Sequence, residues 1–330
     1  MQAIYLEILK IVQAGKIALV KINIGAKAGA FDALNISVVQ VHSSKELTLY
    51  EPESPDTFCY AYVPPARLIL LGGGHIALPI SEFASKTGFK VTVVDDRPRF
   101  ANAYRFPYAK QTLCDAFPVA IEKLNVTQHD YVAVITRGHQ EDEICLETLL
   151  KGRWPAYIGL IGSKRRVSGL FERLIEKGYD KKKLNGIYTP IGLAIGAQTP
   201  EEIAISILSE LIKVKRTVYP LKAKHNICFC YDTIEFLEQI TSQKEPFAIV
   251  TILSTKGSTP RKAGAIMAVT NLGHTLGSIG GGCSENQVIT VARNMIGSSS
   301  YKIVTLDLTN DFEEDEGMVC GGTMEVLIIG

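Results

Sequence analysis

The sequence predicts an α/β protein: a Rossmann-like parallel-sheet domain followed by a smaller α+β domain built from the C-terminal segment. An apolar run typical of a buried strand, residues 68–71, leads into the glycine turn Gly-Gly-Gly-His-Ile-Ala. Strand and helix patterns then alternate to residue 218, and residues 226–330 carry several strands around one helix. At 330 residues the chain exceeds what a single core usually supports, so more than one domain is expected.

The composition excludes several classes of partner. With 35 basic and 34 acidic residues the formal net charge is +1, which gives no general attraction to nucleic acid or to an anionic membrane. No run is long and apolar enough to span a bilayer, and the start does not resemble a signal peptide, so a cytoplasmic protein is expected. The seven cysteines are odd in number and lack zinc-site spacing, which argues against a disulfide framework.

Residues 1–64 are expected to form a small α+β segment that ends where Pro64 and Pro65 break the chain. The expected elements are a helix over residues 5–14 and strands over residues 17–24 and 36–41. The same order of helix and strand is predicted for residues 231–240 and 247–253. This similarity raises the hypothesis that residues 1–64 are a decayed copy of the C-terminal domain.

The predicted Rossmann-like domain, residues 65–218, opens on a dinucleotide-binding fingerprint. In this pattern Gly72 allows the tight turn, Gly74 allows close approach of a pyrophosphate, and Ala77 lets the helix pack on the sheet. The acids Asp95 and Asp96 follow the next strand at the spacing that binds ribose hydroxyls. The motif therefore predicts a site for NAD(P) or another nucleotide.

Other polar residues of this domain have two interpretations each. His75 in the glycine turn contacts a ligand or is a solvated loop histidine. His139 and Asp142 form an acid–base pair or belong to an ordinary helix start. The basic run 164–166 contacts a phosphate or begins a solvated helix. These loops follow predicted strands, and the carboxyl ends of parallel strands are where open α/β sheets bind ligands.

The stretch 256–285, in the predicted domain 226–330, is unusually rich in glycine and polar residues. Consecutive backbone N–H groups in such loops form anion-binding concavities, to which an arginine adds charge. A pair of tight turns between strands is the alternative. A cysteine beside glycines, close to exposed backbone donors, can be a thiolate ligand or nucleophile. The candidate contacts are Ser258, Thr259, Arg261, Gly280, Gly281, Gly282, Cys283, Cys320 and Gly321.

Several motifs together resemble the xanthine dehydrogenase accessory-factor family, XdhC/CoxI. They are G-S-T-P-R-K-A-G (257–264), G-S-I-G-G-G-C-S-E (277–285) and G-M-V-C-G-G-T-M-E-V (317–326), with L-G-G-G-H-I-A, V-V-D-D-R-P-R-F-A, T-R-G-H-Q-E-D-E, Y-I-G-L-I-G-S-K-R-R and P-I-G-L-A-I-G-A-Q-T-P-E-E-I-A in the Rossmann-like half. The resemblance extends from about Pro65 to the end of the chain. Family members usually place the T-P-R/G-G-G-C domain before the Rossmann half, whereas here it follows.

The resemblance implies a cytoplasmic maturation factor without turnover of its own. Such a factor binds molybdenum cofactor, protects it while a cysteine desulfurase installs the terminal sulfur, and delivers it to a molybdenum hydroxylase such as xanthine dehydrogenase. Ser258, Thr259, Arg261 and the glycines would hold anionic oxygens, and Cys320 or Cys283 would face molybdenum or sulfur, with Cys320 the candidate metal contact. A homodimer is expected, because a cleft between subunits would shield a labile ligand.

Two other functions fit the same residues. The fingerprint and His139 are also consistent with an NAD(P)-dependent oxidoreductase. A nucleotide-sensing regulatory protein would use the same fingerprint without chemistry. Binding and turnover of NAD(P)H with a small carbonyl substrate would indicate the oxidoreductase, and ligand-dependent complex formation without chemistry would indicate the sensor. Molybdenum content would separate the sensor from the accessory factor.

Overall fold

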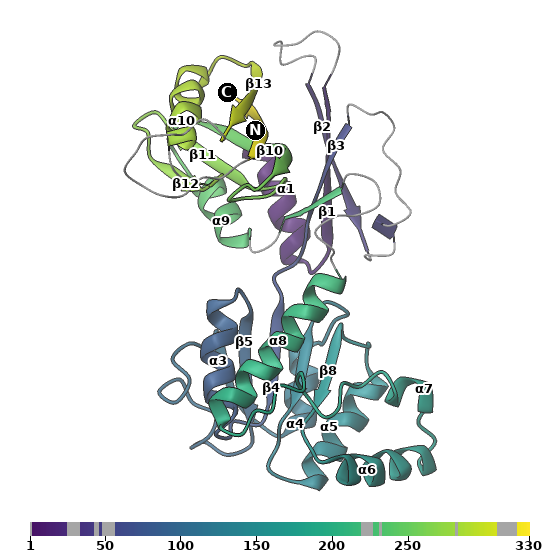
Figure 1. Ribbon diagram of the computed structural model, residues 1–330. Coiled ribbons are helices and arrows are strands. Elements are labelled where there is room, and N and C mark those ends of the chain that lie inside the picture. The colour runs from purple at the N-terminus through teal and green to yellow at the C-terminus, as the bar shows by residue number, and fades with distance from the viewer. Residues whose placement is uncertain are drawn as a thin grey trace. The chain divides into compact units, whose positions relative to one another are not determined.

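The computed structural model describes residues 2–24, 34–42, 46–47, 57–218, 227–230, 233–280, 283–308 and 322–330 (Figure 1). Gly281, Gly282, Cys320 and Gly321 of the candidate site lie outside these residues. The chain forms two compact units. We call Pro65–Tyr219 the Rossmann unit, and Met1–Pro64 together with Pro220–Gly330 the composite unit.

The Rossmann unit alternates strands and helices in the predicted order. Its elements are β4 (Arg67–Leu71), α3 (Ala77–Lys86), β5 (Lys90–Asp95), β6 (Gln111–Cys114), α4 (Phe117–Leu124), β7 (Tyr131–Val134), α5 (His139–Lys151), β8 (Tyr157–Leu160), α6 (Lys164–Glu176), α7 (Lys181–Leu184) and α8 (Pro200–Val218).

A parallel sheet with the strand order β6-β5-β4-β7-β8 forms the centre of this unit. The central strand β4 pairs with β5 on one side and β7 on the other, so the direction of strand succession reverses between β4 and β7. The carboxyl ends of these strands therefore flank a topological switch point, where open sheets bind ligands. The predicted Rossmann-like sheet is confirmed.

Alternate residues of each strand enter different cores, because successive side chains of a strand point to opposite faces. On β4, Leu68 and Leu70 pack with α3 and α8, whereas Ile69 and Leu71 pack with α4, α5 and α6. Both faces of the sheet are covered by helices (Figure 1). This two-sided burial explains why the strands read as unbroken apolar runs.

The composite unit is built from both ends of the chain. Its elements are α1 (Gln2–Gln13), β1 (Ile17–Ile24), β2 (Leu34–Val41), β3 (Thr57–Tyr62), β9 (Ile227–Cys230), α9 (Ile234–Ser242), β10 (Phe247–Gly257), β11 (Ile266–Thr270), β12 (Thr275–Gly277), α10 (Cys283–Met295), β13 (Tyr301–Asp307) and β14 (Gly322–Ile329).

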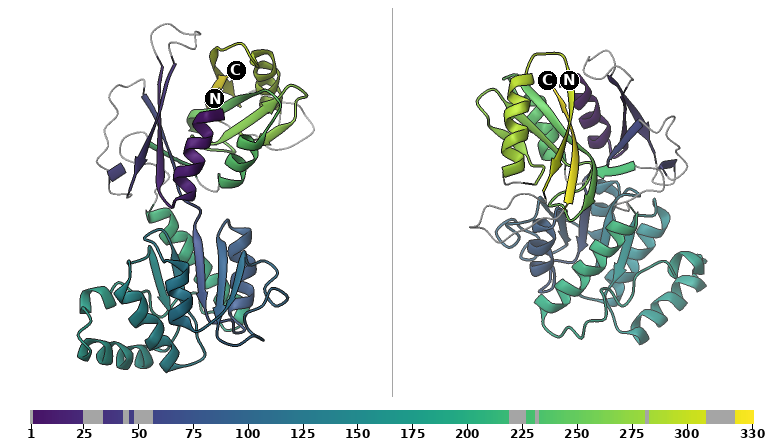
Figure 2. Two further views of the ribbon diagram at one scale, coloured as in Figure 1. Left: turned by 180° about the vertical axis from the view of Figure 1, so that it is seen from behind. Right: turned by 45° about the horizontal axis from the view of Figure 1, so that its top comes forward.

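Two sheets share one core in this unit. One has the order β2-β1-β3-β9 and the other β12-β11-β10-β14-β13. Helices α1 and α9 pack between them, and α10 covers the outer face of the second sheet (Figures 1 and 2). The common core joins Val20 and Tyr60 of the N-terminal segment to Ile249 and Leu327 of the C-terminal segment. The described helix and strands of the N-terminal segment thus bury their apolar faces against the C-terminal part.

The two halves of the composite unit repeat one topology. Strand β1 follows α1 and pairs antiparallel with β2 and β3, and β10 follows α9 and pairs antiparallel with β11 and β14. The order β2-β1-β3 therefore corresponds to β11-β10-β14, and the second sheet is extended at its two edges by β12 and β13. This is the arrangement that an ancestral duplication would leave.

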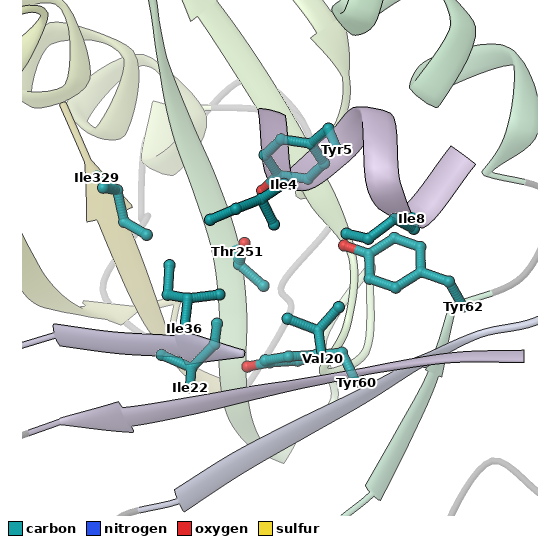
Figure 3. A pocket seen from close by; sticks show the side chains of 10 residues that line it. All are labelled: Ile4, Tyr5, Ile8, Val20, Ile22, Ile36, Tyr60, Tyr62, Thr251 and Ile329. Carbon is teal, nitrogen blue, oxygen red and sulfur yellow. The ribbon is translucent and has the colours of Figure 1, made fainter. Parts of the chain in front are cut away.

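Figure 3 shows a small cavity in the composite core, surrounded by side chains from α1, β1, β2, β3, β10 and β14. Its volume is about 20 Å³, and its lining is mainly isoleucine and tyrosine. That volume holds about one water molecule. A ligand larger than a water molecule therefore cannot enter it.

Candidate functional site

The glycine turn after β4 lies at the switch point of the Rossmann unit. Gly72 has a φ of 118°, and a Cβ placed on it would lie 2.3 Å from the carbonyl oxygen of Ile135. A Cβ on Gly73 would lie 2.0 Å from the carbonyl oxygen of Phe100. A Cβ on Gly74 would meet nothing within 4 Å. Packing therefore requires the first two glycines, and only Gly74 adjoins open space that a ligand could approach.

Asp95, at the end of β5, is bonded to the protein itself. Its side chain is 2% exposed, and its oxygens accept hydrogen bonds from Gly73 N at 2.8 Å and from Arg97 Nε at 2.8 Å. Burial acts to raise the pKa of Asp95, but the hydrogen bonds from Arg97 and Gly73 outweigh it and hold the pKa below its ordinary value. Asp95 is therefore a charged carboxylate, and its hydrogen bond from Gly73 N holds the glycine turn in place.

Asp96 is the more accessible of the two predicted ribose-binding acids. Its side chain is 34% exposed and forms a bidentate ion pair with Arg137, at 2.7 and 3.0 Å. Arg137 follows β7 and also contacts Glu141 at 3.1 Å. The pair bridges the loops after β5 and β7, so a ribose reaching Asp96 would share the carboxylate with Arg137 or displace it.

His75 and Ala77 occupy different environments. His75 is exposed in the glycine turn, whereas Ala77 begins α3 and is fully buried in the core. No side chain caps α3 at Ile76. The first N–H groups of such a helix lack intrahelical acceptors, which suits an anionic ligand at the turn.

His139 and Asp142 both lie in the first turn of α5, but Asp142 has other partners. It is buried, accepts a hydrogen bond from Thr136 Oγ1 at 2.6 Å, and is ion-paired with Arg166 of α6. Burial raises the pKa of Asp142 despite these partners. Because its oxygens join the loops after β7 and β8, Asp142 has a clear structural role.

In the composite unit, the loops that carry the glycine motifs converge at one end of the second sheet. A Cβ on Gly280 would lie 2.6 Å from Pro260 Cγ, and a Cβ on Gly322 would lie 2.4 Å from the carbonyl oxygen of Ser258. Gly322 also pairs in register with Gly257. Segments separated by up to 65 positions therefore meet at residues 257–260, and the glycines permit their close packing.

Among the predicted anion contacts, Thr259 is structural and two others are free to reach a ligand. Thr259 is 9% exposed, and its hydroxyl donates to the carbonyl oxygen of Arg261 at 2.9 Å. Ser258 and Arg261 are exposed, as is Lys256. In the described residues neither Arg261 nor Lys256 has a carboxylate partner.

Two acids that support this end were not among the predicted site residues. Glu285 Oε1 in the first turn of α10 accepts a hydrogen bond from Ile279 N at 3.1 Å, and so holds the glycine loop. Glu325 accepts one from Ser254 Oγ at 2.5 Å. The position of Glu285 just inside a helix that follows a glycine run could have indicated this role, because acids favour helix N-termini.

The cysteines differ in accessibility. Cys59 and Cys230 are buried, Cys228 is partly buried and Cys114 is exposed. Burial raises the pKa of Cys228 to about 11, so it is a poor nucleophile. Cys283 begins α10, and Cys320 precedes Gly322 by two positions in the sequence.

The described ranges contain neither a metal-binding cluster nor a membrane-spanning helix. No group of three or more His, Cys, Asp and Glu side chains there is arranged to hold a metal ion. Nor does any helix in those ranges combine the length and apolarity needed to cross a bilayer.

Comparison with known proteins identifies both parts of the chain. Residues 68–211 match the XdhC Rossmann domain, and residues 240–307 match the XdhC and CoxI family. A protein of Bacillus subtilis, named as a probable subunit of xanthine dehydrogenase, is 35% identical over 52% of this chain and 50% of its own length. The uncharacterized protein YqeB of Escherichia coli is 34% identical over 45% of this chain and 27% of its own length.

The chain thus spans half the length or less of these curated relatives. A crystal structure described as a xanthine dehydrogenase from Bacillus halodurans superposes with a TM-score of 0.52 at 29% identity, covering 66% of this chain and 65% of that one. The two family domains occur with the Rossmann domain first, the reverse of the order that family members usually show. The chain belongs to the XdhC/CoxI family.

Proposed function

We propose that this protein is an accessory factor that binds molybdenum cofactor and inserts it into a molybdenum hydroxylase of the xanthine dehydrogenase type. The observation that carries the proposal is the convergence of residues 257–262, 278–280 and Gly322 at one end of the second sheet of the composite unit. Family membership and the names of the relatives support the same client class.

The residues at this end fit the chemistry of the cofactor. Molybdopterin carries a phosphate and an oxygen-rich metal bound by a dithiolene, and anionic groups of this kind suit the exposed guanidinium of Arg261 and the ammonium of Lys256. The hydroxyl of Ser258 is exposed beside them. When bound, the cofactor would supply the soft metal and sulfur chemistry that a cysteine such as Cys320 or Cys283 can contact.

Reversible binding is also part of the proposal. A carrier must release its ligand, so charge and hydrogen bonds around the cofactor suit delivery better than multidentate metal ligation does. A cysteine desulfurase that sulfurates the bound cofactor, and a homodimer that shields it, complete the proposed cycle in the cytoplasm.

The test measures molybdopterin carried by the full chain, purified from cells that make the cofactor and read by pterin fluorescence after oxidation. We expect Arg261→Ala and Cys320→Ala each to lower the bound pterin several-fold. Matched controls are Lys302→Ala, an exposed cation at the other end of the same sheet, and Cys114→Ala, an exposed cysteine of the Rossmann unit. Retention of pterin in both site variants would contradict the site, and its absence from wild-type protein would contradict the function.

A second candidate function, nucleotide binding by the Rossmann unit, is supported by the open space beside Gly74. NAD(P) is the ligand for which the fingerprint is known. Because Asp95 is buried, the informative variant is Asp96→Ala, which removes the accessible acid without opening the core. Titration calorimetry with NAD should show weaker binding to this variant. Turnover of a carbonyl substrate would favour an oxidoreductase, and binding without turnover would favour a nucleotide sensor.

A further inference from the structure

A second cavity, in the Rossmann unit, lies between the N-terminal turns of α5 and α6. It is a broad depression of about 670 Å³ that is largely open to solvent. Its lining includes His139 and Gln140 from the start of α5 and Ser163, Arg165, Arg166 and Arg173 from α6 and the residue before it. Both helices start just after strands, at the carboxyl end of the sheet. The cavity is separate from the glycine turn, none of whose residues line it.

The side chains that line the cavity carry a net positive charge, even after the ion pairs among them and their neighbours are subtracted. Arg173 contacts Glu143 at 2.9 Å, and Glu143 is also bound by Lys177 at 2.8 Å. Arg166 is ion-paired with the buried carboxylate of Asp142. Arg165 is exposed and has no carboxylate partner in the part of the chain that the structure describes. Its guanidinium is therefore available to an anion in the cavity.

The start of α6 contradicts the usual charge preference of helices. Its first three residues are Lys164, Arg165 and Arg166, and its first turn contains no acid. The helix dipole places partial positive charge at this end, so cations there are unfavourable and anions favourable. Of the three cations, Arg166 alone is ion-paired within the described ranges, with Asp142. Lys164 and Arg165 thus oppose the helix dipole without a carboxylate partner in the described ranges, and departures from such local rules are found at functional sites.

Backbone donors reinforce the side chains at the same point. Ser163 is the N-cap of α6, and its hydroxyl accepts from Arg166 N at 3.4 Å. The N–H groups of the first helical residues have no intrahelical acceptor. Guanidinium and helix N–H groups on one wall form the usual surroundings of a bound phosphate.

We propose that the cavity between α5 and α6 is a binding site for a small molecule that carries a phosphate group. Arg165 and the N-terminal N–H groups of α6 contact the phosphate oxygens, and His139 and Gln140 form the facing wall against the remainder of the ligand. Glu143 does not repel the phosphate, because Arg173 and Lys177 neutralise it. The site is independent of the loops proposed above for molybdenum cofactor.

The first experiment is titration calorimetry of the full chain with inorganic phosphate and, separately, with AMP at low ionic strength. We expect saturable binding that weakens as salt is added, because the contacts are ionic. Arg165→Ala should weaken it at least tenfold. Arg153→Ala is the matched control: Arg153 is also exposed but precedes β8, at the opposite end of the sheet, and its loss should leave binding unchanged.

A second variant separates ligand binding from folding. Arg165→Glu places an acid in the first turn of α6, so the melting temperature of the ligand-free protein should stay the same or rise while phosphate binding is lost. AMP binding much tighter than phosphate binding identifies a nucleotide as the ligand class, and equal affinities identify recognition of the phosphate alone. Either result supports the site when Arg165→Ala weakens the same binding, which separates it from nucleotide binding at the glycine turn. No binding of either probe by the wild-type chain, or equal binding by wild type and Arg165→Ala, would overturn it.

Discussion

The two glycine-rich regions of this protein look alike in sequence but differ in how their charges are used. In the Rossmann unit two cations beside the glycine turn have carboxylate partners, Arg97 with Asp95 and Arg137 with Asp96, and a third, Arg105, donates to the carbonyl oxygen of Gly73. In the composite unit the cations beside the glycine loops, Lys256 and Arg261, have no carboxylate partner among the described residues. The comparison teaches that glycines serve close backbone packing in both places, whereas the ion pairs seen in the described residues differ: Asp95 and Asp96 hold two arginines at the Rossmann turn.

The largest expected effect tests whether the glycines of the Rossmann turn serve packing. Gly72→Ala should destabilise the unit by about 3 kcal/mol, because the methyl group would overlap the carbonyl oxygen of Ile135 at a positive φ. Gly74→Ala, with open space around it, should stay within about 0.5 kcal/mol. Urea unfolding followed by the fluorescence of Trp154, the chain's one tryptophan, reports on this unit alone. Equal losses in the two variants would contradict the packing argument.

The next effect concerns the internal satisfaction of charge. Asp95→Asn keeps the shape of the side chain but removes the charge that Gly73 N and Arg97 contact, and should destabilise the Rossmann unit by about 2 kcal/mol. The same Trp154 unfolding curve measures it. A loss no larger than that of an exposed aspartate would mean that the carboxylate does not hold the turn.

Acid should reduce the difference between wild type and Asp95→Asn. The pKa of Asp95 is lowered in the folded state, so its stabilisation is present above the unfolded-state value, about 3.9, and disappears as pH falls through the folded-state pKa. Unfolding free energies of the two proteins should therefore converge at low pH and separate at pH 7. A difference that is independent of pH would show that the charge of Asp95 contributes nothing.

In the composite unit, a smaller effect is expected at the glycine loop. Glu285→Ala removes the acceptor of Ile279 N and should cost about 1 kcal/mol of local stability. Amide hydrogen exchange at Ile279 is the measurement and should accelerate, because this unit contains no tryptophan to report on the change. Gln287→Ala, an exposed substitution on the same helix, is the control and should leave the exchange rate unchanged. Unchanged exchange in Glu285→Ala would exclude the anchoring role.

The smallest effect should come from the exposed pair across the switch point. Asp96→Asn breaks the contact with Arg137 but should cost less than about 1 kcal/mol, since exposed ion pairs are screened by water and salt. Comparison with Asp95→Asn by the same unfolding assay isolates the effect of burial on two adjacent aspartates. A loss as large as that of Asp95→Asn would remove the distinction between them.

Sequence patterns predicted most of the architecture, because periodicity and turn residues act locally. The strand β1 has the predicted bounds, and the glycine turn after β4 has the expected strand and helix around it. The strand β6 had no counterpart among the predicted elements, since its four residues lie at the sheet edge and are largely accessible, without an apolar run. For the start of α6 the sequence permits two interpretations, a phosphate contact or a solvated helix start, because the N-cap Ser163 is followed by basic residues where acids are usual.

The sequence by itself determined where the chain needs glycine and where strands must be buried. It also indicated the family, because the family motifs consist of contiguous residues. The tertiary structure alone decided which acid is accessible, because Asp95 is held by a hydrogen bond from Gly73, a residue 22 positions earlier in the chain. It alone decided that residues 1–64 complete the core of the C-terminal segment, since β3 pairs with β9 across more than 160 intervening positions. Both outcomes depend on contacts between distant residues, which local propensity does not encode.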